Sequence, residues 1–356
     1  MNRFINIIFS FLIAHTLSAQ YTVSPSTIKW YDIDQAHELN KKAPRPILID
    51  LYTNDCSWCE HMMKTTFANH GIANYINNNF YAVRFNAEST DTVEFQGRKY
   101  FNRKVGRKPT HDLASILLNG NLSYPSIVYF DRNGKKTIIS GFKEPKDIEP
   151  TLAYIVENLS GYVSLSEYTA NFMFTYPAAF EKDHSIFKIP REIKPDTLGI
   201  PNWIEPTKIN IQNKKKRRPF IVFFYSNEYI SSKVMEKTTF GNKKISELLN
   251  KNFRVVKFDA RSQNTITFLG KQYSGTGKGK THQLTNSLLQ NNVQMPAVAF
   301  FDERGKPITK FNGYLNVKNL EKMLHFYNEK KYETISYNEY LKSLKTSNSG
   351  TNSSMN

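Results

Sequence analysis

Residues 46–63 of the chain read PILIDLYTNDCSWCEHMM, and this stretch contains both of the protein's cysteines, Cys56 and Cys59. The apolar run that leads into it is typical of a buried strand, and the residues after Cys59 have the spacing of a helix. A CxxC motif therefore stands where a strand gives way to a helix. Free backbone N–H groups and the positive end of a helix dipole stabilise a thiolate at such a position.

The two cysteines are predicted to have different chemical roles. Cys56 stands at the start of the helix, so it is the candidate attacking thiol in disulfide exchange. Cys59 comes one helical turn later and is close enough to form a disulfide with Cys56, which would release a substrate from a mixed disulfide. Cys59 is therefore the candidate resolving thiol.

The first 19 residues have the pattern of a secretory signal. Arg3 is followed by a mainly apolar run from Phe4 to Leu17 and then by the small pair Ser18-Ala19. This run is too short to span a bilayer comfortably, so we predict cleavage and a soluble protein in the periplasm or outside the cell; an uncleaved anchor is the alternative. In an oxidising compartment, one close cysteine pair is a reagent and not a structural scaffold.

Composition and charge limit the classes of function. The chain has 356 residues, of which 40% are hydrophobic, so it is long enough for two packed domains and is not disordered throughout. The net charge is +17, and basic residues cluster at 214–218, 98–108 and 271–280. We interpret these clusters as solvated surface, because no nucleic-acid motif accompanies them; contact with an acidic partner or an anionic membrane surface is the alternative.

The chain repeats itself. Residues 225–240 align with residues 52–67 without a gap, His282 matches His111, and Pro296 matches Pro125. The protein is thus predicted to be a tandem duplication. The predicted divisions are a signal peptide (1–19), a first domain with the CSWC motif (29–172), a proline-containing connector (173–205), a second domain without cysteines (206–345) and a disordered Ser/Asn-rich tail (346–356).

The first unit resembles the thioredoxin superfamily. The resemblance is carried by the strand before the CxxC, the helix after it, a strand led by Pro125, and Asp50 six residues ahead of Cys56. Within the superfamily it resembles exported thioredoxin-like proteins. The implied fold class is α/β, with two tandem thioredoxin-like domains, each a central mixed sheet flanked by helices.

The resemblance also implies roles for single residues. Pro125 would be the family's cis-proline, facing the CxxC and turning the backbone of Tyr124 toward a bound peptide; a trans edge proline is the alternative. Asp50 would be buried with a raised pKa and would carry a proton for Cys59, with Arg84 nearby; a solvated strand-end acid is the alternative. Trp58 would shield the cysteines and contact substrate, or would simply pack.

The second unit departs from the family at the decisive positions. It has Tyr229 for Cys56, Ser232 for Cys59 and Phe223 for Asp50. The loss of the acid together with both thiols has a physical reason. A buried carboxylate only destabilises the fold when there is no dithiol for it to deprotonate. The second unit is therefore predicted to be a binding or spacing module, with a peptide groove around Pro296.

Together these features predict an exported thiol-disulfide oxidoreductase that acts on protein disulfides. The residues between the cysteines, Ser57 and Trp58, lack the histidine that strongly stabilises a thiolate in oxidising members, which favours a reductase or isomerase. We expect no metal, no organic cofactor and no nucleic-acid partner, but an upstream electron donor or acceptor protein. Two alternatives remain: a non-catalytic protein-binding module, and a metal site formed by Cys56, Cys59 and His61 with His70 or His111.

Overall fold

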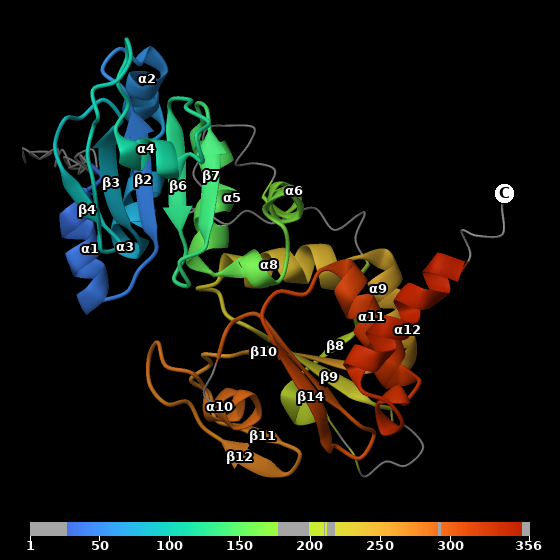
Figure 1. The fold of residues 1–356 in the computed structure, drawn as a ribbon. Helices are drawn as coiled ribbons and strands as arrows, with labels where there is room; N and C mark the ends of the chain where they lie inside the picture. Colours follow the sequence, from blue (N-terminus) through green and yellow to red (C-terminus); the bar gives the residue numbers. More distant parts are fainter. Residues whose placement is uncertain (1–26, 177–198, 210, 212–217, 291–292, 351–356) are drawn as a thin grey trace, which may run out of the picture.

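The computed structural model describes residues 27–176, 199–209, 211, 218–290 and 293–350. The predicted signal segment lies outside these residues. The chain forms two domains, each with a mixed five-stranded sheet flanked by helices, so the predicted fold class is confirmed (Figure 1). Among the described residues, no helix has the length and apolar character needed to cross a bilayer.

The first domain contains one mixed sheet in the order β1-β3-β2-β6-β7. Strands β1 and β3 run parallel to β2, and β6 runs antiparallel to it. In chain order, the elements are β1 (Trp30–Tyr31), α1 (Ile33–Lys42), β2 (Ile47–Tyr52), α2 (Ser57–Thr65), α3 (His70–Asn79), β3 (Tyr81–Asn86), β4 (Val93–Phe95), β5 (Arg98–Tyr100), α4 (Asp112–Leu117), β6 (Ser126–Phe130), β7 (Lys136–Ser140), α5 (Pro145–Val156), the 3-10 turn η1 (Leu159–Gly161) and α6 (Leu165–Thr175).

The second domain repeats this topology, with the strand order β8-β10-β9-β13-β14. Its elements are β8 (Trp203–Ile204), η3 (Pro206–Lys208), β9 (Phe220–Tyr225), α8 (Ile230–Met235), the π-helical turn η5 (Glu236–Phe240), α9 (Lys243–Asn252), β10 (Arg254–Asp259), β11 (Ile266–Phe268), β12 (Lys271–Tyr273), α10 (Gln283–Leu289), β13 (Ala297–Phe301), β14 (Pro307–Asn312), α11 (Val317–Asn328), η6 (Lys331–Glu333) and α12 (Tyr337–Gly350). The duplication read from the sequence is therefore a duplication of the fold.

Strand β2 lies at the centre of the first sheet and is buried on both faces. Its odd-numbered residues from Ile47 to Leu51 pack with α1 and α4, whereas Leu48 packs with Met62 of α2 on the other face. A central strand covered on both faces is expected to be almost entirely apolar. Asp50 interrupts this pattern, and by the alternation of side chains it lies on the same face as Leu48 and α2.

Two predicted boundaries are wrong. Strand β8, at Trp203–Ile204, falls inside the predicted connector but pairs with β10, as β1 pairs with β3 in the first domain. Helix α12 continues to Gly350, so residues 346–350 are helical and not part of a disordered tail. Extending a helix already started by packed residues costs less than starting one, so the polar end of α12 continues it.

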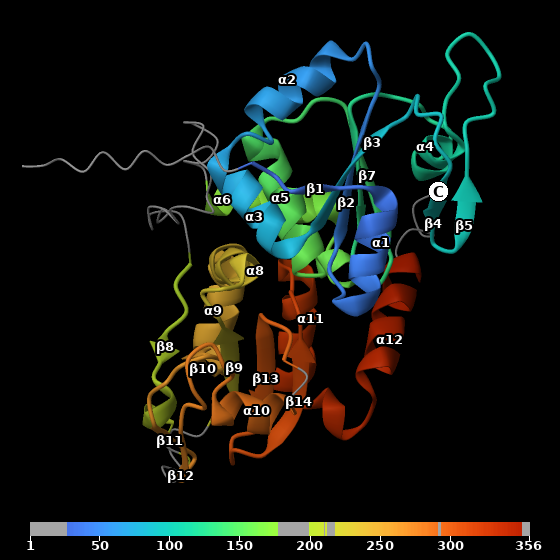
Figure 2. The same cartoon turned by 90° about the vertical axis from the view of Figure 1, so that its left-hand side faces the viewer.

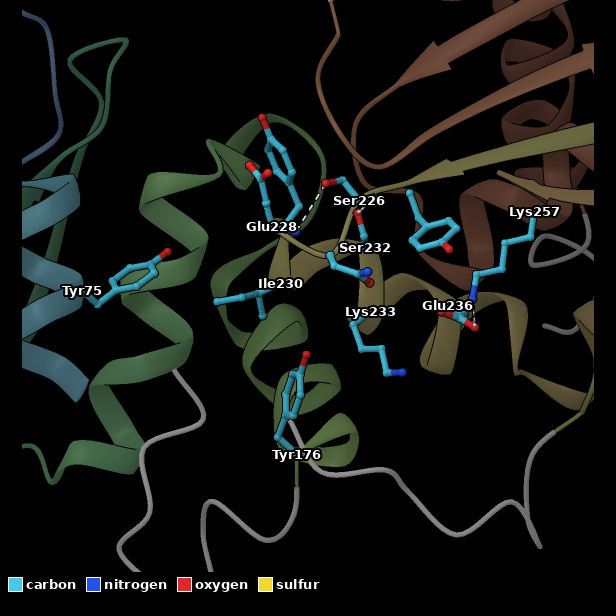
Figure 3. A pocket seen from close by; sticks show the side chains of 12 residues that line it. Tyr75, Tyr176, Ser226, Glu228, Ile230, Ser232, Lys233, Glu236 and Lys257 are labelled. Carbon is cyan, nitrogen blue, oxygen red and sulfur yellow. Dashed lines mark hydrogen bonds and ion pairs between the residues drawn. The ribbon is translucent and has the colours of Figure 1, made fainter. Parts of the chain in front are cut away.

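The two domains pack against each other through the end of the first repeat. Helix α6 lies beside α8 in both views (Figures 1 and 2), and the ring of Tyr168 on α6 contacts the ring of Tyr314 at 5.9 Å between centroids. Buried apolar residues of both domains form one continuous cluster. A cavity of about 450 Å³ lies at this junction, lined by Tyr75 and Tyr176 of the first domain and by residues of the second (Figure 3).

Candidate active site

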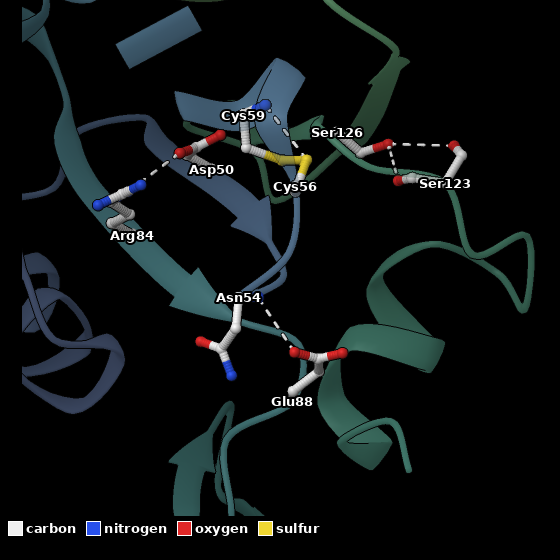
Figure 4. Close-up of a disulfide and its surroundings, with 8 residues drawn as sticks. All are labelled: Asp50, Asn54, Cys56, Cys59, Arg84, Glu88, Ser123 and Ser126. Atoms are coloured by element: carbon white, nitrogen blue, oxygen red, sulfur yellow. Dashed lines mark hydrogen bonds and ion pairs between the residues drawn. A yellow bond between two sulfur atoms is a disulfide. The ribbon is translucent and has the colours of Figure 1, made fainter. Parts of the chain in front are cut away.

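The CxxC motif lies at the start of α2, with Cys56 as the residue before the first helical turn. Cys56 and Cys59 form a disulfide, and the backbone N–H of Cys59 also lies 3.2 Å from the Sγ of Cys56 (Figure 4). The two sulfurs differ in access, because Cys56 is partly exposed whereas Cys59 is only 2% exposed. This difference fits the predicted roles of an attacking and a resolving thiol.

Asp50 is fully buried on β2, on the sheet face that α2 covers. Neither of its carboxylate oxygens has a hydrogen-bond partner among the described residues. The Nε atom of Arg84 lies 3.6 Å from Oδ2, which is an ion pair but too long for a hydrogen bond. Burial raises the pKa of Asp50 to about 7, and the nearby Arg84 charge partly opposes this shift. The Asp50 carboxyl can therefore gain or lose a proton near neutral pH.

A cavity of about 380 Å³ lies beside the motif. It is lined by Cys56, Cys59 and Arg84, together with Tyr52 and Asn54. The Arg84 guanidinium lies 4.2 Å from the centroid of the Tyr52 ring, which fixes the side chain beside Asp50. Figure 4 shows the Asp50 carboxylate on the Arg84 side of the disulfide.

Tyr129 is a further polar residue beside Asp50 that the sequence analysis missed. It lies on β6, opposite Leu48 of β2, and its hydroxyl is buried without a hydrogen-bond partner in the described part of the chain. Burial raises the pKa of Tyr129, and the charge of Asp50 raises it further. The second repeat has Phe300 and Phe223 at these two places, so both polar groups are missing there together. Comparing the repeats along this strand could have revealed the pair.

The proline expected to face the motif has the predicted geometry. The Tyr124–Pro125 peptide bond is cis, as is Met295–Pro296 in the second domain. Figure 4 shows Ser123 and Ser126, which flank this turn, on the opposite side of the disulfide from Asp50. The Tyr124 side chain is partly buried and packs against the core of the first domain.

Trp58 is exposed and belongs to an aromatic patch beside the cysteines. It exposes 59% of its surface, and its ring lies 5.7 Å from that of His61 and 5.3 Å from that of Phe142. The rings of His61 and Phe142 are 5.0 Å apart. Phe142 follows β7 and is distant in sequence, so no local pattern could have placed it in this patch.

The geometry gives no support to the alternative of a metal site. His111 is fully buried at the start of α4, where its Nδ1 accepts from the Leu113 backbone at 3.1 Å and its Nε2 lies 2.9 Å from the Asp91 carbonyl. Both ring nitrogens therefore have structural partners. Within the described residues, no group of three or more His, Cys, Asp or Glu side chains is arranged to bind a metal ion.

The matching place in the second domain has neither thiol nor buried carboxyl. Ser232, in the place of Cys59, accepts a hydrogen bond from the Ser226 backbone at 3.3 Å, and Phe223 packs against Phe240 in the place of Asp50. The predicted groove around Pro296 is not open, because Gln294 beside it contacts the backbone of Glu157 in the first domain at 3.1 Å.

The raised pKa of Asp50 leads to a prediction about stability. The contribution of this carboxyl is fully present below its ordinary pKa of 3.8 and is lost as the pH rises through about 7, where the folded protein must bury a charge. We expect the Asp50→Asn variant to be more stable than the wild type above pH 7, by on the order of 4 kcal/mol, and the difference to shrink toward pH 4. Urea unfolding of the oxidised protein across this pH range measures it.

The exposed Asp55, in the loop before the motif, provides a matched control. An Asp55→Asn variant should follow the wild-type pH dependence. If the Asp50→Asn variant did so as well, Asp50 would not carry a raised pKa.

Known proteins and domains are similar to parts of this chain. A model of the thioredoxin-like domain family matches residues 33–156 and 207–328. No curated protein matches the chain. Similar solved structures include DsbH oxidoreductase (17% identity, 36% of this chain and 81% of that one, TM-score 0.26) and a thioredoxin-fold protein from Helicobacter pylori (17%, 42% and 89%, TM-score 0.27). A third is ERdj5 (14%, 85% and 27%, TM-score 0.22).

These solved structures are too distant to bear on activity. The family model, by contrast, covers more than half of the chain and matches both repeats. The protein therefore belongs to the thioredoxin-like domain family, with two tandem copies of the domain and a CxxC pair in the first copy only.

Proposed function

We propose that this protein is an exported thiol-disulfide oxidoreductase that reduces or isomerises disulfides of client proteins. The observation that carries the proposal is the asymmetry of the cysteine pair. Cys56 is partly exposed at a helix start, and Cys59 is buried on the side of the buried Asp50. This arrangement separates the step that needs access to a client from the step that needs a nearby proton acceptor.

The exchange takes place in two steps. The Cys56 thiolate attacks one sulfur of a client disulfide, a mixed disulfide forms, and the other client sulfur leaves as a thiolate that takes up a proton. Cys59 then loses its proton and attacks the Cys56 sulfur, which reforms the Cys56–Cys59 disulfide and releases the second client thiolate. Two electrons pass from the dithiol to the client, so a partner dithiol protein must reduce the pair again.

Asp50 is the proposed proton acceptor for Cys59. A carboxyl with a pKa of about 7 can take a proton near neutral pH, whereas an ordinary carboxyl is too weak a base. Arg84 keeps this pKa from rising further. Tyr129 lies on β6, on the side of β2 opposite Arg84.

The proposed client surface surrounds Cys56. It comprises the exposed ring of Trp58, the backbone of Tyr124 and the cis-Pro125, and it extends over His61 and Phe142. Aromatic rings beside a reactive thiol provide apolar contact area for a client of variable sequence. The proposed location outside the cytoplasm and the reducing or isomerising direction rest on the sequence alone, from residues 1–19 and the Ser57-Trp58 pair.

The covalent step can be tested by trapping. In the Cys59→Ser variant, the resolving thiol is absent, so the mixed disulfide with Cys56 should accumulate. We expect adducts between this variant and an oxidised protein such as insulin, visible on non-reducing gels and removed by a reducing agent. The Cys56→Ser/Cys59→Ser variant should give none. If the Cys59→Ser variant bound insulin without forming an adduct, the protein would be a binding module.

The role of Asp50 can be tested through the pH dependence of resolution. In the wild type, release of client from a preformed mixed disulfide should accelerate as the pH rises through about 7. The Asp50→Asn variant should lose this inflection and slow by about 100-fold, since positioned acid–base groups contribute at least that much. Single-turnover quenching with an alkylating reagent measures the step.

Arg84 provides the internal check on this assignment. The Arg84→Gln variant removes the charge that opposes the pKa rise, so its inflection should move to higher pH. An unchanged profile in both variants would rule out Asp50 as the proton acceptor.

A further inference from the structure

Glu157, at the end of α5, sends its side chain into the second domain. It is buried, and its two carboxylate oxygens accept hydrogen bonds from the backbone N–H groups of Ile230 at 2.7 Å and Ser231 at 2.9 Å. These are the first two residues of α8. The matching residues in the first domain are Ser57 and Trp58, which follow the attacking cysteine. A carboxylate of the first domain thus takes the place where a thiolate of the second domain would have been stabilised.

The loop before the second cis-proline also binds the first domain. Gln294 lies two residues before Pro296, and its Nε2 donates to the Glu157 carbonyl at 3.1 Å. Its Oε1 accepts from the Tyr162 hydroxyl, also at 3.1 Å. The matching residue in the first domain is Ser123, beside the proposed client surface. The second domain therefore binds residues 157–162 with the same two elements that flank the disulfide in the first.

Gly313, which follows β14, completes this contact. A Cβ at this position would lie 2.4 Å from the ring of Tyr162, so the ring packs directly on the glycine. The same ring lies 5.8 Å from that of Phe311. The matching glycine, Gly141, has nothing within 4 Å of a Cβ. The face is covered in the second domain and open in the first.

Matching residues of the two repeats also differ in how much of their surface is exposed to solvent. Trp58 is 59% exposed, whereas Ser231 at the matching position is 0% exposed. Glu329, which matches Glu157 at the end of α11, keeps a side chain 44% exposed and pairs with His325 and Lys331 of its own domain. Only the first repeat uses this glutamate to contact another domain.

Further contacts extend the interface along α6. Asn171 donates to the Tyr314 hydroxyl at 3.1 Å, and Asn316 donates to Glu167 at 3.2 Å. The cavity beside Ser232, which corresponds to the cavity behind the disulfide, is bordered by Tyr75 and Tyr176 of the first domain (Figure 3).

We propose that the second domain is an internal docking module whose former active-site face is occupied by residues 157–162 of the first domain. The occupant places a carboxylate at the helix start and an aromatic ring on the glycine near the cis-proline. The second domain is therefore closed to outside clients and instead fixes its own position on the first. Figures 1 and 2 show α2 at the end of the first domain that is remote from the second, so docking leaves the CxxC face free.

Thiol labelling measures whether this face is closed in solution. In a Cys56→Ser/Cys59→Ser background, a single probe is introduced by Ser231→Cys or, as the matched position, by Trp58→Cys. We expect the Ser231→Cys thiol to react with an alkylating reagent about 100-fold more slowly than the Trp58→Cys thiol in the folded protein, and equally fast in urea. Equal rates in the folded protein would overturn the proposal. The background carries no redox pair, so the result is independent of the proposed activity.

A second set of variants tests the contacts themselves. In the Ser231→Cys background, Glu157→Ala should accelerate labelling about 10-fold or more, whereas Glu329→Ala should leave the rate unchanged. Equal effects of these two changes would overturn the role of Glu157.

The two glycines form another matched pair. Both have a positive φ, +120° at Gly313 and +80° at Gly141, so alanine strains the backbone at either site. Only Gly313→Ala also meets the Tyr162 ring, so only this change should open the face to labelling. If Gly313→Ala fails to fold, Tyr162→Ala removes the ring instead. Unchanged protection in Tyr162→Ala, or equal acceleration by Gly141→Ala and Gly313→Ala, would overturn the contact.

Discussion

The structure depends on one constraint that both repeats share, the unpaired backbone N–H groups at the start of the helix after the central strand. Such groups, together with the helix dipole, favour a negative charge nearby. In the first domain the chain itself supplies the sulfur of Cys56 at this place. In the second domain it supplies the carboxylate of Glu157 from the other repeat. One physical requirement thus supports reactivity in one copy and docking in the other.

The two repeats also differ in the core beneath this helix start. Burial raises the pKa of Asp50, and the carboxyl destabilises the folded state when it is charged. In the second domain, Phe223 fills this position and packs against Phe240 at 4.6 Å and Trp203 at 5.9 Å between ring centroids. In the second domain, apolar packing thus takes the place of the buried carboxyl. Its apolar cluster continues into the first domain, which makes the pair of domains one packed unit.

The sequence predicted those features that local pattern and internal repetition encode. Strand β2 lies where the apolar run before the CxxC predicts it, since a buried central strand is a continuous apolar run between turn signals. The CxxC at a helix start, the burial of Asp50 and the two cis-prolines follow from motif positions that the family resemblance supplied. The repeat also revealed that the second copy had lost its thiols and its acid. Each of these needs only residues close in sequence or matched between copies.

Only the tertiary structure decided how these parts meet. Glu157 and Glu329 are the same residue at matching positions, yet one is buried against another domain and the other is exposed. Trp58 and Ser231 likewise owe their exposure to what does or does not cover them. Burial at an interface depends on surfaces far apart in the chain, whose complementarity leaves no periodicity in either segment. The sequence therefore determined the fold and the cysteine pair, whereas the packing of the two domains determined which of the two matching helix-start faces remains open.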